Sequence, residues 1–213
     1  MTTSTTNADA APARKSIIPV ALTVFRIAMG PVIAGLILTA AYWVHLDPLL
    51  SGFIYAFCTL LFVLAAATDW LDGYFARKLD AVTPLGAALD HSADKVLIVC
   101  VLVALAYAAL PFNLVIAAVI ILGRDVLIAG LREGLSGTGR SLPVSDIGKW
   151  KAAGEMAGVA VFLAFQAGAL LYLPVELLLG LSWAARLLLW AAAALALFSG
   201  GQYVAALLKK QPQ

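Results

Sequence analysis

Four aspartates stand close together in the stretch TDWLDGYFARKLDAVTPLGAALDHSADK, which covers residues 68–95. Asp69 and Asp72 are three residues apart, and Asp90 and Asp94 are four residues apart, so each pair shares one face if its segment is helical. Carboxylates gathered in one place repel one another unless a cation neutralises them, and a ligand set made of oxygens suits Mg²⁺ or Mn²⁺ better than Zn²⁺. The spacing therefore predicts a site for one or two divalent ions.

Small and basic residues lie between these aspartates. Gly73, Ala76 and Gly86 would let two helices approach closely, and Gly73 would also leave space for a nucleotide. Arg77 is placed to meet phosphate oxygens. The alternative is an ordinary charged loop whose acids are solvated, but it does not suit the last two aspartates, because they begin a long apolar run.

The rest of the chain is strongly apolar. Of its 213 residues, 63% are hydrophobic and 12% are charged, whereas about a quarter of a soluble domain is charged. A helix that crosses a bilayer needs roughly 20 apolar residues, and six stretches are long enough: 17–44, 50–75, 85–110, 112–133, 148–171 and 184–207. Because backbone groups find no water in hydrocarbon, each stretch should be helical. We expect an all-α membrane domain of six transmembrane helices over residues 17–208, after a disordered cytoplasmic tail at residues 1–16.

The distribution of charge predicts the orientation of these helices. Lys and Arg are concentrated at both termini and in the second and fourth connections, so the positive-inside rule places both termini in the cytoplasm. Charges inside the spans are costly, and in this topology they all map to the cytoplasmic half: Arg26, Asp69, Asp72, Asp90, Asp94, Lys95, Arg124, Asp125 and Glu155. This one-sided arrangement predicts a polar cavity that faces the cytoplasm, and not a pore. A net charge of +2 gives no reason to expect nucleic-acid binding.

The acids and the small and basic residues between them form one pattern: Asp69-x2-Asp72-Gly73-x2-Ala76-Arg77-x8-Gly86-x3-Asp90-x3-Asp94. This pattern resembles the signature of the CDP-alcohol phosphotransferase family at every specified position. The resemblance implies that an alcohol displaces CMP from a CDP-linked molecule at a site with two divalent ions, Mg²⁺ or Mn²⁺. It also implies a homodimer.

The same resemblance implies a role for each residue of the pattern. The four aspartates would hold the metal ions, the first three chiefly, and Asp94 would be the general base that takes the proton of the acceptor hydroxyl. The CMP moiety would be lined by Gly73, Ala76, Arg77 and Gly86.

A second polar stretch, residues 123–156, bears on the identity of the acceptor alcohol. Arg124 and Arg132 are eight residues apart, about two turns, and so lie near one helix face. Lys149 and Lys151 open the next span. These cations would suit a small phosphorylated acceptor, since Arg binds phosphate oxygens in pairs. The alternative is that Arg124 pairs with a neighbouring acid and that the other cations only mark the cytoplasmic side; for Lys151 both interpretations stand.

This stretch is similar to the corresponding region of bacterial phosphatidylglycerophosphate synthases within the family. The similarity implies transfer of the phosphatidyl group of CDP-diacylglycerol to glycerol 3-phosphate in a bacterial cytoplasmic (inner) membrane. It assigns the contacts with glycerol 3-phosphate to Arg124, Arg132 and Lys149. Two other acceptors stay open, namely phosphatidylglycerol, as in cardiolipin synthesis, and inositol phosphate. A different class also stays open: a small transporter that relays protons through its buried carboxylates.

Overall fold

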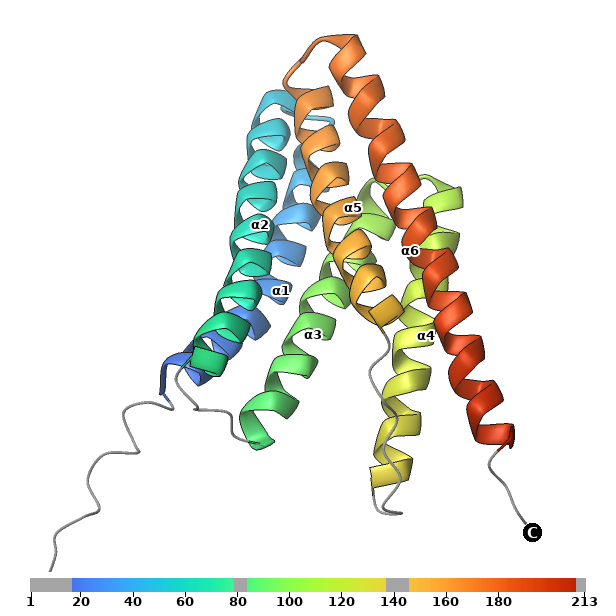
Figure 1. Cartoon of the computed structure of the whole chain (residues 1–213). Coiled ribbons are helices and arrows are strands. Elements are labelled where there is room, and N and C mark those ends of the chain that lie inside the picture. The colour runs from blue at the N-terminus through green and yellow to red at the C-terminus, as the bar shows by residue number, and fades with distance from the viewer. Residues whose placement is uncertain (1–16, 79–83, 137–145, 210–213) are drawn as a thin grey trace, which may run out of the picture.

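The computed structural model describes residues 17–78, 84–136 and 146–209, and within these ranges the regular elements are six α-helices (Figure 1). In chain order they are α1 (Ile17–Trp43), α2 (Pro48–Lys78), α3 (Pro84–Ala108), α4 (Phe112–Ser136), α5 (Asp146–Leu170) and α6 (Val175–Lys209). Both aspartate pairs of the sequence pattern therefore fall on helices, as their spacing predicts.

Successive helices run in opposite directions, so the first residue of α1 and the last residue of α6 lie at the same end of the bundle (Figure 1). We call this the termini end. Short connections at residues 44–47, 109–111 and 171–174 lie at the opposite end. Helix α1 packs on α2 and α3, α5 packs on α2 and α6, and α4 packs on α6 and more lightly on α3.

Five helices contain a described stretch that is long and apolar enough to cross a membrane: Thr23–Trp43, Pro48–Thr68, Phe112–Leu135, Gly148–Leu170 and Val175–Tyr203. The chain is thus a multi-pass, all-α membrane protein. Helix α3 is 25 residues long, but its described side chains begin only at Ser92. The count of six spans therefore stays a prediction.

The sixth helix begins earlier than expected, at Val175 instead of residue 184. The carbonyl of Pro174 accepts a hydrogen bond from the backbone N–H of Leu178 at 3.1 Å, which opens the helix. Gly168 of α5 leaves room for the leucines that follow, because a Cβ atom there would lie 2.9 Å from Leu173 Cδ1 and 3.1 Å from Leu178 Cδ2. Packing against α5 thus keeps this segment helical.

The backbones of α1 and α3 approach each other closely at Gly30. A Cβ atom on Gly30 would lie 3.1 Å from the Cα atom of Leu97 and 3.2 Å from the carbonyl oxygen of Val96. Wholly buried side chains, including Ile33 and Leu97, fill the core beside this contact. The relative placement of α1 and α3 is therefore set by backbone contact, and these two helices carry the first part of the site.

Candidate functional site

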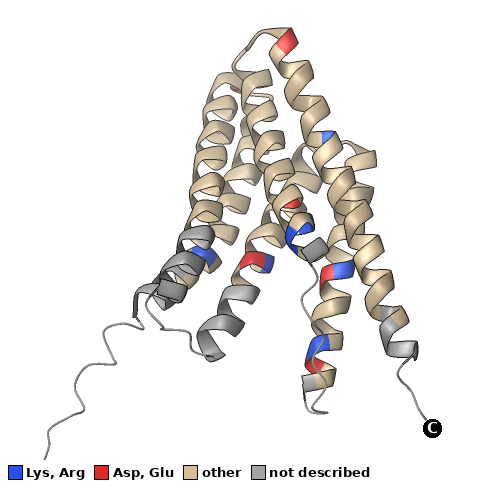
Figure 2. Cartoon of the chain, in the orientation of Figure 1, with Lys and Arg blue, Asp and Glu red and all other residues tan. Residues whose placement is uncertain are grey.

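Charged residues within the helices gather in the half of the bundle nearer the termini end (Figure 2). In this view they lie on α1, α3, α4 and α5, whereas the other half carries few coloured segments. The predicted gathering of charge on one side is therefore present among the described residues. Two groups of contacts make up this polar region.

The first group is an ion pair between α1 and α3. Arg26 is wholly buried, and its Nη1 donates to Oδ1 of Asp94 at 2.7 Å. The Asp94 side chain is 32% exposed, so it lies between the buried guanidinium and the open side of the helix. Arg26 lies one turn before Gly30, and Asp94 lies one turn before Leu97, so the close backbone approach brings the two side chains together.

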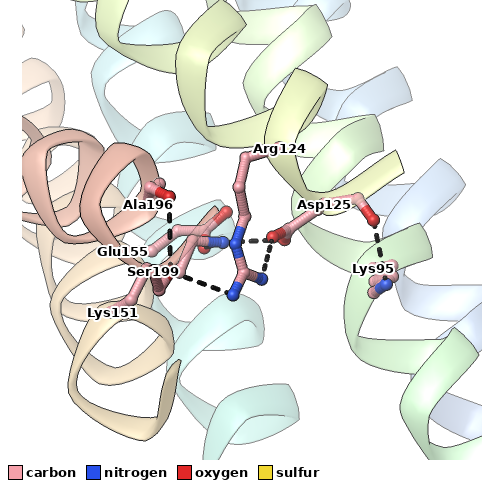
Figure 3. A network of polar contacts seen from close by, with 7 residues as sticks. All are labelled: Lys95, Arg124, Asp125, Lys151, Glu155, Ala196 and Ser199. Carbon is pink, nitrogen blue, oxygen red and sulfur yellow. Dashed lines mark hydrogen bonds and ion pairs between the residues drawn. The ribbon is translucent and has the colours of Figure 1, made fainter. Parts of the chain in front are cut away.

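The second group is a network of ion pairs between α4 and α5 (Figure 3). Arg124 Nη1 contacts Oδ1 of Asp125 at 3.1 Å. Lys151 Nζ contacts Oδ2 of the same Asp125 at 2.7 Å and Oε2 of Glu155 at 2.5 Å. Lys151 and Glu155 are buried, and the side chains of Arg124 and Asp125 are each 14% exposed. Asp125 therefore joins two cations from different helices.

Helices α6 and α3 complete this network. Arg124 Nη2 donates to Ser199 Oγ of α6 at 3.0 Å, and the guanidinium carbon lies 5.8 Å from the centre of the Tyr203 ring. From the other side, Lys95 of α3 donates to the backbone carbonyl of Asp125 at 3.3 Å (Figure 3). Four helices thus meet around Asp125.

The network offers more positive than negative charge. The three cations Lys95, Arg124 and Lys151 surround the two carboxylates of Asp125 and Glu155. Arg124 Nε and Glu155 Oε1 are buried and have no hydrogen-bond partner within the part of the chain that the structure describes. A surplus of cations with an unused donor suits an anion such as phosphate.

The two groups are joined by α3. Asp94 faces α1 and the next residue, Lys95, reaches α4. The predicted general base, Asp94, and the Lys95 member of the cationic network are therefore consecutive residues of α3.

The structure places most of the predicted metal and nucleotide residues on helices, but it does not describe their side chains. Asp69, Asp72, Gly73, Ala76 and Arg77 fall in the last turns of α2, and Gly86 and Asp90 fall in the first turns of α3. Within the described parts, α2 and α3 both pack on α1. No group of three or more potential metal ligands occurs among the described side chains; of the four aspartates, these include only Asp94. The four-aspartate site therefore stays a prediction.

The residues predicted to bind the acceptor are partly brought together. Arg124 and Lys151 both contact Asp125. The contacts of Arg124 therefore agree with the alternative stated above, in which Arg124 pairs with a neighbouring acid. Arg132 lies two turns further along α4 and is partly buried, and Lys149 is exposed in the first turn of α5. On α4, Arg132 lies nearer the termini end than Arg124, and on α5, Lys149 lies nearer that end than Lys151.

Sequence reasoning missed two partners in this site. Arg26 was expected to be a buried charge, but its contact with Asp94 joins residues 68 positions apart, which spacing along one helix cannot reveal. Ser199 carries no charge and sits in a run of apolar residues, so nothing in the sequence distinguishes it from a packing residue. Lys151, for which two interpretations stood, is buried in two ion pairs.

Comparison with known proteins supplies the family. The chain matches the family model described as CDP-alcohol phosphatidyltransferase over residues 16–198. It is 37% identical over 148 residues to the CDP-diacylglycerol–glycerol-3-phosphate 3-phosphatidyltransferase of Haemophilus influenzae, which covers 68% of this chain and 75% of the relative. The protein of the same name from Rickettsia bellii is 37% identical over 193 residues, which cover 90% of this chain and 96% of the relative. A CMP-forming cardiolipin synthase of Oryza sativa is 32% identical over 165 residues, or 72% of this chain and 47% of the relative. The chain thus belongs to the CDP-alcohol phosphatidyltransferase family, as the aspartate pattern predicted.

Proposed function

We propose that this protein transfers the phosphatidyl group of CDP-diacylglycerol to glycerol 3-phosphate and so produces phosphatidylglycerophosphate and CMP. The observation that carries the proposal is the position of Asp94 beside a cationic network, which Lys95 joins to α3. A base next to an anion site is the arrangement that an acceptor with both a hydroxyl and a phosphate requires. The names of the bacterial relatives agree with this acceptor.

Asp94 would act as the general base. Its carboxylate would take the proton of the glycerol 3-phosphate hydroxyl, and the hydroxyl oxygen would form a bond with the phosphorus that carries diacylglycerol. The bond from that phosphorus to the bridging oxygen would break at the same centre, and CMP would leave with the electron pair. A base that acts on the acceptor leads to direct displacement, without a covalent enzyme intermediate.

Asp69, Asp72, Asp90 and Asp94 would hold two divalent ions, Mg²⁺ or Mn²⁺. The donor set fits hard cations, since it consists of carboxylates only, and the helices α2 and α3 carry both pairs at spacings that share a face. When bound, the ions would neutralise the pyrophosphate and stabilise CMP as it leaves. Around the CMP moiety of CDP-diacylglycerol we place Gly73, Ala76, Arg77 and Gly86.

The acceptor phosphate would bind among Arg124, Arg132 and Lys149. Cations that outnumber the carboxylates around Asp125 favour a phosphate with two negative charges, such as glycerol 3-phosphate, over the singly charged diester of phosphatidylglycerol. The transporter alternative is not favoured, because the family to which the chain belongs is named for transferases.

The site would face the cytoplasm of a bacterial cell. The termini end carries most of the charged residues in the helices, and the positive-inside rule puts that end in the cytoplasm, where glycerol 3-phosphate is dissolved. The polar cavity at this end and the homodimer implied by the family resemblance stay predictions.

The test is the release of CMP by purified protein in detergent with CDP-diacylglycerol and Mg²⁺. Glycerol 3-phosphate, inositol phosphate and phosphatidylglycerol are supplied in separate reactions. We expect release only with glycerol 3-phosphate, and none from Asp94→Asn. Asp47→Asn is the matched control: this exposed acid at the opposite end accepts a hydrogen bond from the N–H of Leu50 at 3.0 Å, and asparagine caps a helix equally well. Release with another acceptor instead would contradict the proposed substrate.

A further inference from the structure

Arg26 is a charged side chain buried inside a membrane-spanning segment. It lies in the span Thr23–Trp43 and none of its surface is exposed. Such a charge is costly in hydrocarbon unless it is paired. Its contact with Asp94 at 2.7 Å is short enough to be a charge-assisted hydrogen bond. The pair therefore accounts for how the bundle tolerates a buried arginine at this position.

The exposures of the two partners differ, and this difference indicates what Arg26 can do. Asp94 is 32% exposed while Arg26 is 0% exposed. A wholly buried guanidinium is out of reach of a hydroxyl bound on the open side of Asp94. An effect of Arg26 on the reaction must therefore pass through the groups it contacts.

The geometry of the pair is fixed by the backbone. One turn beyond Arg26, the absence of a side chain at Gly30 lets α1 lie within 3.1 Å of the Leu97 Cα atom, measured from where the missing Cβ would be. The neighbouring Ile33 and Leu97 are wholly buried. Neither helix can slide along the other without a clash, so the guanidinium meets Asp94 in one place. When a catalytic group is moved by about 1 Å, the rate of the catalysed reaction can fall roughly 100-fold.

We propose that Arg26 is a positioning residue for the proposed base: it holds the Asp94 carboxylate in the orientation that receives the proton of the acceptor hydroxyl. This inference rests on the proposed function of Asp94. In this role the buried arginine affects the rate of the chemical step and not the binding of either substrate.

The experiment compares Arg26→Gln and Arg26→Lys with the unchanged protein in the CMP-release assay. Glutamine removes the charge, whereas lysine keeps the charge but not the planar fork of donors. We expect kcat to fall by about 100-fold in Arg26→Gln and by about tenfold in Arg26→Lys. At saturating Mg²⁺, the KM values for both substrates should stay within about twofold in both variants. Arg186→Gln is the matched control, because Arg186 lies in the span of α6 and contacts the Trp183 ring at 5.7 Å; its kcat should change by less than about twofold.

Thermal melting in detergent shows whether each variant is folded. A folded Arg26→Gln protein with unchanged kcat would overturn the inference. So would a higher KM for either substrate at unchanged kcat, because Arg26 would then act on substrate binding. If Arg26→Gln does not fold, the Arg26→Lys variant tests the positioning role. Full activity of Arg26→Lys would show that charge alone matters and would overturn the role. A tenfold loss of kcat at unchanged KM would support it. An unchanged protein that releases no CMP with any acceptor would defeat the proposed function itself, and this inference with it.

Discussion

Lys151 of α5 is buried between two carboxylates, and its replacement by methionine tests whether these contacts hold α4 and α5 together. Its Nζ lies 2.7 Å from Asp125 Oδ2 and 2.5 Å from Glu155 Oε2. Asp125 keeps a second partner, Arg124, at 3.1 Å. Glu155 has no other partner among the described residues, and its Oε1 is already buried without a hydrogen bond. Methionine therefore leaves the buried Glu155 carboxylate without its ion-pair partner.

The expected loss of stability follows from this arrangement. Removal of one partner from a buried ion pair costs about 3–5 kcal/mol. Each kcal/mol shifts the melting temperature of a chain of this length by about 2–4 °C, so Lys151→Met should melt about 6–20 °C lower. Replacement of both charges by apolar side chains of similar size is often neutral or stabilising. The double variant Lys151→Met/Glu155→Leu should therefore melt at a higher temperature than Lys151→Met.

The assay is thermal unfolding of the purified variants in one detergent, followed by intrinsic fluorescence. Lys149→Met is the control, because Lys149 is exposed two residues earlier on the same helix, and surface changes usually stay within about 0.5 kcal/mol. A Lys151→Met protein that melts within 2 °C of the unchanged protein (roughly 1 kcal/mol or less) would refute the reasoning. A double variant that loses as much as the two single variants together would refute the proposed pairing of Lys151 with Glu155.

Three further predictions concern the helix contacts and the metal. Gly30→Val should cost about 1–3 kcal/mol of stability and lower CMP release, because the valine side chain would press on the backbone at Leu97. Gly35→Val is the control, since nothing lies within 4 Å of its Cβ position. Equal losses in both variants would contradict the α1–α3 contact. Ser199→Ala removes the hydrogen bond that Arg124 Nη2 donates to Ser199 Oγ. Because bonds to charged groups contribute about 1.5–3 kcal/mol, the KM for glycerol 3-phosphate should rise by at least about tenfold. An unchanged KM in steady-state assays would separate Arg124 from acceptor binding. EDTA should abolish CMP release, and added Mg²⁺ or Mn²⁺ should restore it; full activity in EDTA would contradict the metal site.

Much of the helical architecture follows from composition and hydropathy. Runs of apolar residues must be helical in lipid because their backbone groups have no other partners, and so the helices begin and end near the predicted positions, from α1 (Ile17–Trp43) to α5 (Asp146–Leu170). The start of α6 escaped prediction because Gly180 and Ser182 interrupt its first turns, and the contact of Leu173 and Leu178 with α5 outweighs this weak helix propensity.

The site was predictable where its residues share a helix and not where they meet across helices. Asp94 and Arg124 stood out because each is a charge in an apolar run. The pairing of Arg26 with Asp94 depends on how α1 packs on α3 at Gly30, and periodicity within one segment carries no information about the register between two. For the same reason the contact of Ser199 with Arg124 could not be foreseen.

The most direct test of the proposed reaction is the incorporation of radiolabelled glycerol 3-phosphate into chloroform-soluble lipid by the purified protein. With CDP-diacylglycerol and Mg²⁺, we predict label in phosphatidylglycerophosphate in equal amount to the CMP released, and none with Asp94→Asn. CMP release without label in the lipid would contradict glycerol 3-phosphate as the acceptor, and full incorporation by Asp94→Asn would contradict the role of Asp94 as the base.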